Sequence, residues 1–397
     1  MFVTLFTLIL LCLYIYGRYI FKKYVSCGHK QLYALKVFNN GRSSLKYQGS
    51  IPILILNEVN EYQNGFVHGY YLAEYIQQLS ANCMRIMRWK LNPKICSNIF
   101  NNLQYPHQLE LIGLVDGYNH WAHKTQNPQK QLYEIVFLHL LPDLSNEEQS
   151  TSLIWSLLKL FGKLTGNLPI FGCTTLVVNS NDGLIMGRNL DWCPFGLSGT
   201  YSLIIHWKKI GITSLTLPGL IGIATGWKRD CVLAMNSCPN SSSLQNIQAC
   251  ALFNNREILE NPKLLETHLL PETPSLNLIP YNLIYCSPLK TQHVCYNIDR
   301  SPYVRDLKDH NPLIALNYNY PTCLLSSLNS TGRLQYLNKN LPVDEESVFK
   351  SLQVKELTNS WLTLHSCVFN LTKGQFHLSM DNGYAASGQY QALKWPF

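Results

Sequence analysis

The sequence predicts an α+β fold in which a mainly helical first part is followed by a second part dominated by strands. Segments before Gly172 carry apolar residues at roughly helical spacing, whereas β-branched and alternating runs between Gly-rich turns dominate from Cys173 onward. With 46% hydrophobic and 14% charged residues among 397, the chain can bury a large core. The sequence has no internal repeat and no low-complexity linker, so we expect the two parts to share one core.

The chain begins with a segment typical of membrane targeting. Residues 2–16 are uncharged and strongly apolar, and Arg18, Lys22 and Lys23 follow them. No basic residue precedes this run and no A-x-A-like cleavage site follows it. Residues 1–24 are therefore predicted to be a signal anchor, with a cleaved signal peptide as the alternative. The positive charges after the run favour the cytoplasmic side of the membrane for the rest of the chain.

Residues 25–172 are predicted to be a helical N-terminal part. After a short extended stretch, three segments carry apolar residues at helical spacing: 65–79, 108–121 and 131–144. The extended stretch covers residues 51–56. A later run, 152–161, is apolar nearly all round, which fits either a buried helix or a surface that contacts lipid.

Residues 173–397 are predicted to form the sheet-rich catalytic part. A β-branched run from Thr174, the turn Asn181-Asp182-Gly183 and a second apolar run predict a hairpin that begins next to Cys173. Further strands are predicted at 201–207, 214–217, 221–225 and 232–235. A last hairpin is predicted from 366–370 and 375–380, around the turn Thr372-Lys373-Gly374.

Charge and cysteine patterns exclude several classes of function. The net charge of +8 arises from 32 basic and 24 acidic residues that are spread thinly, which gives little support to nucleic-acid binding and leaves weak attraction to anionic lipid open. The 13 cysteines include no C-x-x-C pair. His120 and His123 have no carboxylate at helical spacing, so they are interpreted as ordinary histidines. The sequence therefore predicts no metal and no organic cofactor.

The junction between Gly172 and Cys173 has the chemistry of a self-cleaving precursor. A cysteine at the start of a strand can attack the carbonyl of the preceding glycine with little steric hindrance. An N-to-S acyl shift and hydrolysis would then free its α-amine. Such an amine has a reference pKa of about 7.7 to 8.0, so it can act as the base for its own thiol.

Hairpin geometry brings two charged residues back toward Cys173. Because the second strand returns antiparallel to the first, Arg188 and Asp191 are expected to lie beside the cysteine. Asp191 could hold the new α-amine, and Arg188 could offset negative charge on the substrate. Taken alone, the same spacing also fits a buried structural cysteine next to a hairpin ion pair.

A family resemblance favours the catalytic interpretation. The segment GCTTLVVNSNDGLIMGRNLDWCPF, residues 172–195, resembles the autocleavage segment of the family of acid ceramidase and N-acylethanolamine-hydrolysing acid amidase. The Gly-Cys-Thr-Thr junction itself looks closer to that of penicillin acyltransferase, a relative. Further segments are similar to the family's motifs, in the same order along the chain: 64–76, 110–117, 217–226, 315–320, 329–338 and 370–378.

The resemblance implies a fold, an activity and roles for single residues. The fold would be the αββα sandwich of N-terminal-nucleophile hydrolases, with the helical part packed against it. Gly172 and Cys173 would form the autocleavage site, and Cys173 would be the nucleophile. Arg188 and Asp191 would position the amine and the substrate. Asn317 would donate to the oxyanion and Arg333 would assist from the other side. Asn236 either borders the site or is a turn residue.

The resemblance also implies partners and a setting. The two fragments would stay associated after cleavage, and the substrate would be an N-acyl lipid, of the ceramide or N-acylethanolamine type, met at a membrane surface. A periplasmic, lysosomal or extracellular setting conflicts with the charge pattern of the first segment, so the side of the membrane stays open.

Three departures from the family's motifs, Asn319, Gly332 and Leu217-Pro218, leave substrate choice open. Two alternatives remain. One is an acyltransferase of the penicillin acyltransferase type, and the other is an inactive membrane-anchored binding protein.

Overall fold

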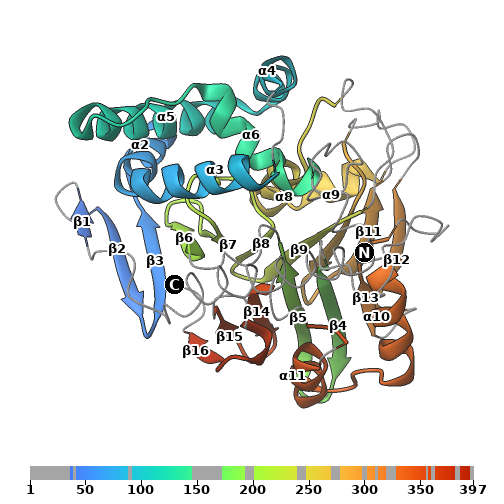
Figure 1. The fold of residues 1–397 in the computed structure, drawn as a ribbon. Helices are drawn as coiled ribbons and strands as arrows, with labels where there is room; N and C mark the ends of the chain where they lie inside the picture. Colours follow the sequence, from blue (N-terminus) through green and yellow to red (C-terminus); the bar gives the residue numbers. More distant parts are fainter. Residues whose placement is uncertain are drawn as a thin grey trace, which may run out of the picture.

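The computed structural model of the protein contains helices and two β-sheets, which confirms the predicted α+β class (Figure 1). It describes residues 36–38, 42–87, 92–144, 172–192, 201–238, 247–269, 278–296, 302–308, 312–318, 328–354, 356–358, 363–380 and 385–393.

The described strands form one sheet of ten strands and one of six. The ten-stranded sheet has the order β1 (Lys36–Phe38), β2 (Ser43–Gln48), β3 (Ile51–Leu56), β6 (Leu203–Trp207), β7 (Ile212–Thr216), β8 (Thr225–Lys228), β9 (Cys231–Ser237), β10 (Tyr281–Cys286), β11 (Thr291–Tyr296), β12 (Tyr303–Asp306). The six-stranded sheet has the order β13 (Leu313–Ala315), β4 (Thr174–Ser180), β5 (Gly183–Asp191), β14 (Thr363–Asn370), β15 (Gln375–Ser379), β16 (Gln391–Leu393). All pairings are antiparallel except that of β3 with β6.

Two groups of helices accompany the sheets. The first part and the segment after β9 supply α2 (Glu61–Tyr71), α3 (Ala73–Met87), α4 (Pro93–Asn102), α5 (Tyr105–Thr125), α6 (Leu132–Leu144), α8 (Ala251–Glu260) and α9 (Lys263–His268). The later segments supply α10 (Leu328–Lys339), α11 (Glu345–Gln353) and the short 3-10 helix η4 (Ala385–Ser387).

Because successive side chains of a strand point to opposite faces, the buried apolar side chains fall into three separate cores. In β3, Leu54 packs with the first group of helices, whereas its neighbour Ile53 packs in a core between the two sheets. In β14, Phe369 belongs to the same inter-sheet core, and its neighbour Val368 packs with α10 and α11. The described elements are therefore arranged as helices, ten-stranded sheet, six-stranded sheet and helices, with a separate apolar core between each pair of layers (Figure 1).

The first part contributes to the same sheet as the second part. Strand β3 pairs with β6 over four residue pairs, from Ile53 with Ile204 to Leu56 with Trp207. Above this sheet, α2 and α5 are in unusually close contact. A Cβ atom on Gly65 would lie 1.9 Å from the carbonyl oxygen of Glu110, so only glycine fits there. This approach fixes α2 and α5 relative to one another over the sheet.

Most predicted elements are confirmed, with three differences. Segment 51–56 is β3, segments 108–121 and 131–144 lie within α5 and α6, and both predicted hairpins are present. The predicted helix 65–79 is interrupted at Leu72 and continues as α3. The first part also holds β1 and β2, which the apolar pattern did not indicate.

The predicted strand 221–225 is wrong for all but its last residue. Only Thr225 joins a strand, because the backbone groups of Ile221 and Ile223 bond to side chains and to helix α8 instead of to a neighbouring strand. Ile221 N–H donates to His139 Nε2 at 2.9 Å, and Ile223 C=O accepts from Asn255 Nδ2 at 2.9 Å. Segment 217–224 is thus an irregular connection between β7 and β8.

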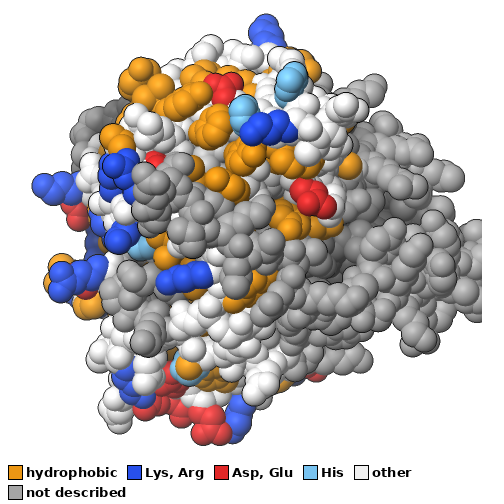
Figure 2. Space-filling model, turned by 90° about the vertical axis from the view of Figure 1, so that its left-hand side faces the viewer, with side chains coloured by type: hydrophobic (Ala, Val, Ile, Leu, Met, Phe, Trp, Pro, Cys, Tyr) orange, Lys and Arg blue, Asp and Glu red, His pale blue; other side chains and the backbone are white. Residues whose placement is uncertain are grey.

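No described helix is long and apolar enough to cross a membrane. The predicted signal segment, residues 1–24, and the apolar run 152–161 lie outside the described residues. On the face shown in Figure 2, Lys and Arg side chains are scattered among hydrophobic and neutral ones.

Candidate active site

Cys173 lies directly before β4, in the position that the hairpin prediction gave it. The register pairs Thr174 with Asn189 and Thr175 with Arg188, so the end of β5 returns to the start of β4. The Cys173 Sγ lies 3.8 Å from the backbone oxygen of Asp191, and the residue is only 4% exposed. The hairpin therefore brings Cys173, Arg188 and Asp191 into one buried region.

The peptide bond between Gly172 and Cys173 is held by an arginine from a distant helix. Arg333 in α10 donates through Nη1 to the carbonyl oxygens of both Gly172 and Cys173, the second at 2.7 Å. On Gly172, a Cβ atom would lie 2.9 Å from Oδ2 of Asp191, so this carboxyl is next to the glycine. The carbonyl carbon that Cys173 would attack thus has a cationic donor on its oxygen.

Asn317 and Ser330 hold Arg333 in this position. The Nη2 of Arg333 donates to Asn317 Oδ1 at 3.1 Å and to Ser330 Oγ at 3.2 Å. Ser330 lies one helical turn before Arg333, so both side chains are on one face of α10. The Asn317 amide donates to Ser237 O at 2.7 Å. In the uncut chain Asn317 is therefore engaged with Arg333 and Ser237, and its role toward an oxyanion stays a prediction.

Asn236 lies deeper in the site than a border residue. Its Nδ2 donates to the carbonyl oxygens of Ala315, at 2.7 Å, and Cys173, at 3.4 Å. Its Oδ1 accepts from Arg188 Nη1 at 3.1 Å and from Thr175 Oγ1 at 2.9 Å. Arg188 Nη2 also donates to Met235 O, at 2.6 Å. Asn236 thus connects β9, β13 and the Cys173 hairpin, and Arg188 is fixed by neutral oxygens.

Burial determines the electrostatics of these groups. Both Arg188 and Arg333 are fully buried, and burial lowers the pKa of each. Burial raises the pKa of Asp191 to about 7, against the opposing effects of Thr363 and the two arginines. Burial also raises the pKa of the Cys173 thiol, although Arg188 opposes this. A carboxyl with a pKa near 7 can both take up and release a proton at neutral pH.

A small cavity reaches Cys173 from the side of the first helix group. It has a volume of about 30 Å³, room for roughly two water molecules, since one needs about 10 to 15 Å³. Apart from Cys173 and Asp191, most of its wall is apolar: Pro142, Leu190, Trp192, Leu215, Leu217, Leu220, Gly222, Ala224, Met235, Leu252 and Leu364. The cavity in the uncut chain is too small for an acyl chain.

Sequence reasoning missed several residues of the site. Thr363 in β14 donates to Asp191 Oδ1 at 2.6 Å, and its register opposite Asp191 is fixed only by sheet pairing. Trp192 and Ser202 line the cavity, and the indole N–H and the hydroxyl have no hydrogen-bond partner among the described residues. Of these three, only Trp192 carried a signal, because it directly follows Asp191 in the segment that resembles the autocleavage motif.

Metal binding finds no candidate in the part of the chain that the structure describes. No group of three or more His, Cys, Asp or Glu side chains is placed there to hold an ion. Eight cysteines of the described segments, Cys173 among them, form no disulfide there.

Comparison with known proteins adds little to this geometry. No family model matches the chain, and no curated protein matches it. Among solved structures, the chain is similar to the Caenorhabditis elegans N-acylethanolamine-hydrolyzing acid amidase ortholog, with a TM-score of 0.43 and 19% sequence identity. That likeness covers 56% of this chain and 100% of the other. A likeness this weak does not establish a common activity.

Proposed function

We propose that the protein is a self-cleaving cysteine amidase with the αββα fold of N-terminal-nucleophile hydrolases. One observation carries the proposal: Arg333 donates to the Gly172 carbonyl oxygen while the Cys173 thiol and the Asp191 carboxyl lie at the same peptide bond. Burial disfavours a charged arginine, so two buried guanidiniums in this site favour a functional role.

Self-cleavage would begin with attack of the Cys173 thiol on the Gly172 carbonyl carbon. Negative charge would develop on the carbonyl oxygen, which Arg333 already contacts. The thiol proton would pass to the Cys173 nitrogen, with the Asp191 carboxyl as carrier, as the C–N bond breaks. Water would then hydrolyse the thioester. This step leaves the Gly172 carboxylate on one fragment and a free thiol and α-amine on Cys173.

Amide hydrolysis would follow with the same groups in new roles. The α-amine takes the thiol proton, and the thiolate attacks the substrate carbonyl. Asn317 and Arg333 would stabilise the oxyanion, since departure of the Gly172 carbonyl leaves Arg333 without that acceptor. The ammonium group protonates the leaving amine, and water releases the acid from the thioester. Asp191 would hold the α-amine, and Arg188 would keep Asn236 in place.

The substrate would be an N-acyl lipid met at a membrane surface. Its support is the wall beside Cys173, where leucine side chains outnumber polar ones. The Trp192 N–H and the Ser202 hydroxyl, to which no other described group bonds, are suited to bind oxygen atoms of the amine portion. Because the cavity of the uncut chain is small, we expect cleavage and withdrawal of residue 172 to open it. The two fragments would stay associated, and an exported or membrane-anchored location remains an expectation.

Intact mass spectrometry with N-terminal sequencing tests the proposal. Wild type and Cys173→Ala are incubated at pH 5 and pH 7.5. A new N-terminus at Cys173 in the wild type alone would support the mechanism. The cut protein is then assayed with ceramides and N-acylethanolamines, with and without an added amine that would divert the acyl group to a transferase product. A wild-type chain that stays uncut at both pH values would refute the proposal and favour the binding-protein alternative.

A further inference from the structure

Segment 217–224 forms one wall of the cavity beside Cys173. Its residues Leu217, Leu220, Gly222 and Ala224 all line the cavity. The segment is irregular, and it meets strand β9 at its end, where Met235 N–H donates to Ala224 O at 2.9 Å. Strand pairing therefore does not fix the shape of residues 217–223. Whatever binds its backbone groups therefore decides the shape of this wall.

Two histidines from the first part accept hydrogen bonds from this backbone. Gly219 N–H donates to Nε2 of His68 in α2, and Ile221 N–H donates to Nε2 of His139 in α6, both at 2.9 Å. Both imidazoles are completely buried. The first part of the chain, which Cys173 chemistry would separate covalently, thus supplies the acceptors for two N–H groups of the cavity wall.

Helix α8 also binds this segment, mainly through the carbonyl groups of the segment. Arg256 Nη1 donates to Ile221 O at 3.0 Å, and Asn255 Nδ2 donates to Ile223 O at 2.9 Å. The N–H of Ile223 donates to Leu252 O at 2.9 Å. Since α8 belongs to the second part, the wall is held between the two parts rather than by either one alone.

A tight turn directs Gly219 toward the first part. Leu220 N–H donates to Leu217 O at 3.2 Å, and Gly219 has a φ of 85°, as the third residue of a type II turn requires. A Cβ atom there would lie 3.2 Å from Ile76 in α3. The turn therefore presents its N–H to His68 in a conformation that favours glycine.

An imidazole nitrogen accepts a hydrogen bond only when it carries no proton. In His139, Nδ1 lies 3.0 Å from Ile135 O and must donate, which leaves Nε2 as the acceptor. Burial lowers the pKa of His139 to about 4 and that of His68 to about 3. Both side chains are thus neutral acceptors well into the acidic range.

We propose that His68 and His139 are positioning residues that set the shape of the substrate-facing wall, so that the first part remains a component of the binding site after cleavage. The inference rests on the proposed function, because it takes this cavity as the place where Cys173 meets an acyl substrate. Replacing either histidine should therefore affect substrate binding more than the chemical step. Both histidines bond to the wall segment and not to the reacting groups at Cys173.

The test compares His139→Leu with His139→Gln and with a matched control, His107→Leu. Leucine removes the acceptor, whereas glutamine places an oxygen near the former Nε2. His107 is also buried in α5 at the contact between the two parts, but its Nε2 faces Glu260 at 3.0 Å instead of the wall. Two properties are measured on the cut enzyme: hydrogen exchange of the peptide covering 217–224, and KM and kcat with N-palmitoylethanolamine.

For His139→Leu we expect faster exchange in this peptide and a KM raised about tenfold, equivalent to about 1.4 kcal/mol, with kcat changed less than threefold. Glutamine should restore KM to within about threefold. His107→Leu should lower the melting temperature and leave exchange and KM unchanged. Equal increases in KM for both leucine variants, or unchanged exchange in His139→Leu, would overturn the inference. If the wild type is cut but turns over no N-acyl amide, the proposed function fails and the binding role fails with it, whatever the exchange result.

Discussion

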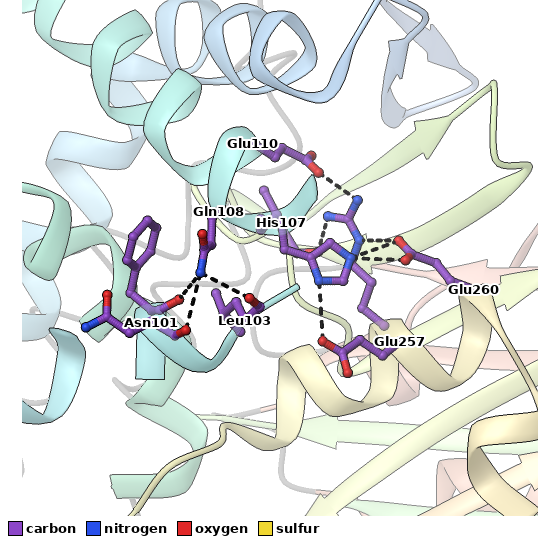
Figure 3. A network of polar contacts seen from close by, with 10 residues as sticks. Asn101, Leu103, His107, Gln108, Glu110, Glu257 and Glu260 are labelled. Atoms are coloured by element: carbon purple, nitrogen blue, oxygen red, sulfur yellow. Dashed lines mark hydrogen bonds and ion pairs between the residues drawn. The ribbon is translucent and has the colours of Figure 1, made fainter. Parts of the chain in front are cut away.

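The protein buries arginines in two regions that differ in the groups bound to the guanidinium: carboxylates in one region and neutral oxygens in the other. Between the two parts of the chain, Arg256 pairs with Glu110 at 2.6 Å and with Glu260 at 2.9 Å, and its guanidinium lies 4.7 Å from the ring centre of Trp207. Figure 3 shows Glu110 and Glu260 of this contact, with His107 and Glu257 beside them. At the candidate active site, Arg188 and Arg333 bond to neutral oxygens. The first region has two carboxylates for one arginine, and the second has two guanidiniums beside the carboxyl of Asp191.

The pKa shifts follow this difference. Burial favours the neutral form of all three arginines, but Glu110 and Glu260 outweigh burial for Arg256 and raise its pKa. Burial prevails for Arg188 and Arg333, and their pKa is lowered. Removing one partner of the Arg256 pairs would destabilise the contact between the two parts of the chain, whereas the arginines of the candidate site can stabilise a developing negative charge. The comparison predicts that replacing Arg256 mainly lowers stability, whereas replacing Arg333 mainly slows self-cleavage.

Replacing Arg256 should have the largest effect on stability. Arg256→Met leaves the buried Glu110 carboxylate without its charged partner and with the hydrogen bond from Trp207 Nε1, so we expect a loss of about 3 to 5 kcal/mol in the free energy of unfolding. Urea unfolding of the uncut Cys173→Ala chain measures this loss. The double variant Arg256→Met, Glu110→Gln, in which no uncompensated carboxylate remains at 110, should recover part of it. A loss below 1 kcal/mol in the single variant would refute the contrast.

Replacing Arg333 should have the largest effect on self-cleavage. Arg333→Met removes the donor to the Gly172 carbonyl oxygen, and a lost oxyanion donor slows such reactions by about 10² to 10³-fold. The rate of precursor loss, followed by gel densitometry, measures this effect. Stability should change little or rise, because burial disfavours the charge that methionine removes. Arg333→Lys serves as the control that keeps the charge. Cleavage at the wild-type rate in Arg333→Met would contradict the assigned role.

Asp191 provides a test of the site's charge through pH. The pKa of Asp191 is raised to about 7 in the folded chain, against about 3.9 in the unfolded chain. Protonation of Asp191 therefore stabilises the fold, fully below about pH 3.9, and this stabilisation is lost as the pH rises through 7. In the Cys173→Ala background, Asp191→Asn should therefore gain about 2 to 4 kcal/mol relative to its parent between pH 4.5 and pH 8. In the active background it should block self-cleavage. A pH-independent difference in unfolding free energy would show that Asp191 has an ordinary pKa.

How far the sequence could predict this site depends on the separation of its residues along the chain. Cys173 and Asp191 belong to one hairpin, so the turn at Asn181-Asp182-Gly183 and the two-residue period of strands were enough to bring them together. Asn317 and Arg333 came only from the family resemblance. No periodicity could bring Arg333 to a carbonyl group 161 residues away.

Two other features escaped prediction for a physical reason. Segment 221–225 has the apolar composition of a strand, but side chains of His139, Arg256 and Asn255 form hydrogen bonds with backbone groups inside it. Composition does not reveal such tertiary bonds. Likewise, the pairing of β3 with β6 joins strands on both sides of Cys173, so the change from helical to strand-like pattern at residue 173 does not coincide with a break in the sheet.

The smallest expected effect concerns the hydrogen bond that Thr363 donates to Asp191. This bond favours the charged carboxylate and so opposes the increase of the Asp191 pKa by burial. Thr363→Val removes the hydroxyl at nearly constant volume, so the pKa of Asp191 should rise further, by about 0.5 to 1. The pH profile of self-cleavage, measured as the rate of precursor loss from pH 5 to 9, should shift to higher pH by the same amount. Thr363→Ser keeps the donor and should retain the wild-type profile. A profile that stays fixed in Thr363→Val would mean that a group other than Asp191 carries the proton, and would remove Asp191 from the self-cleavage step while leaving the role of Arg333 intact.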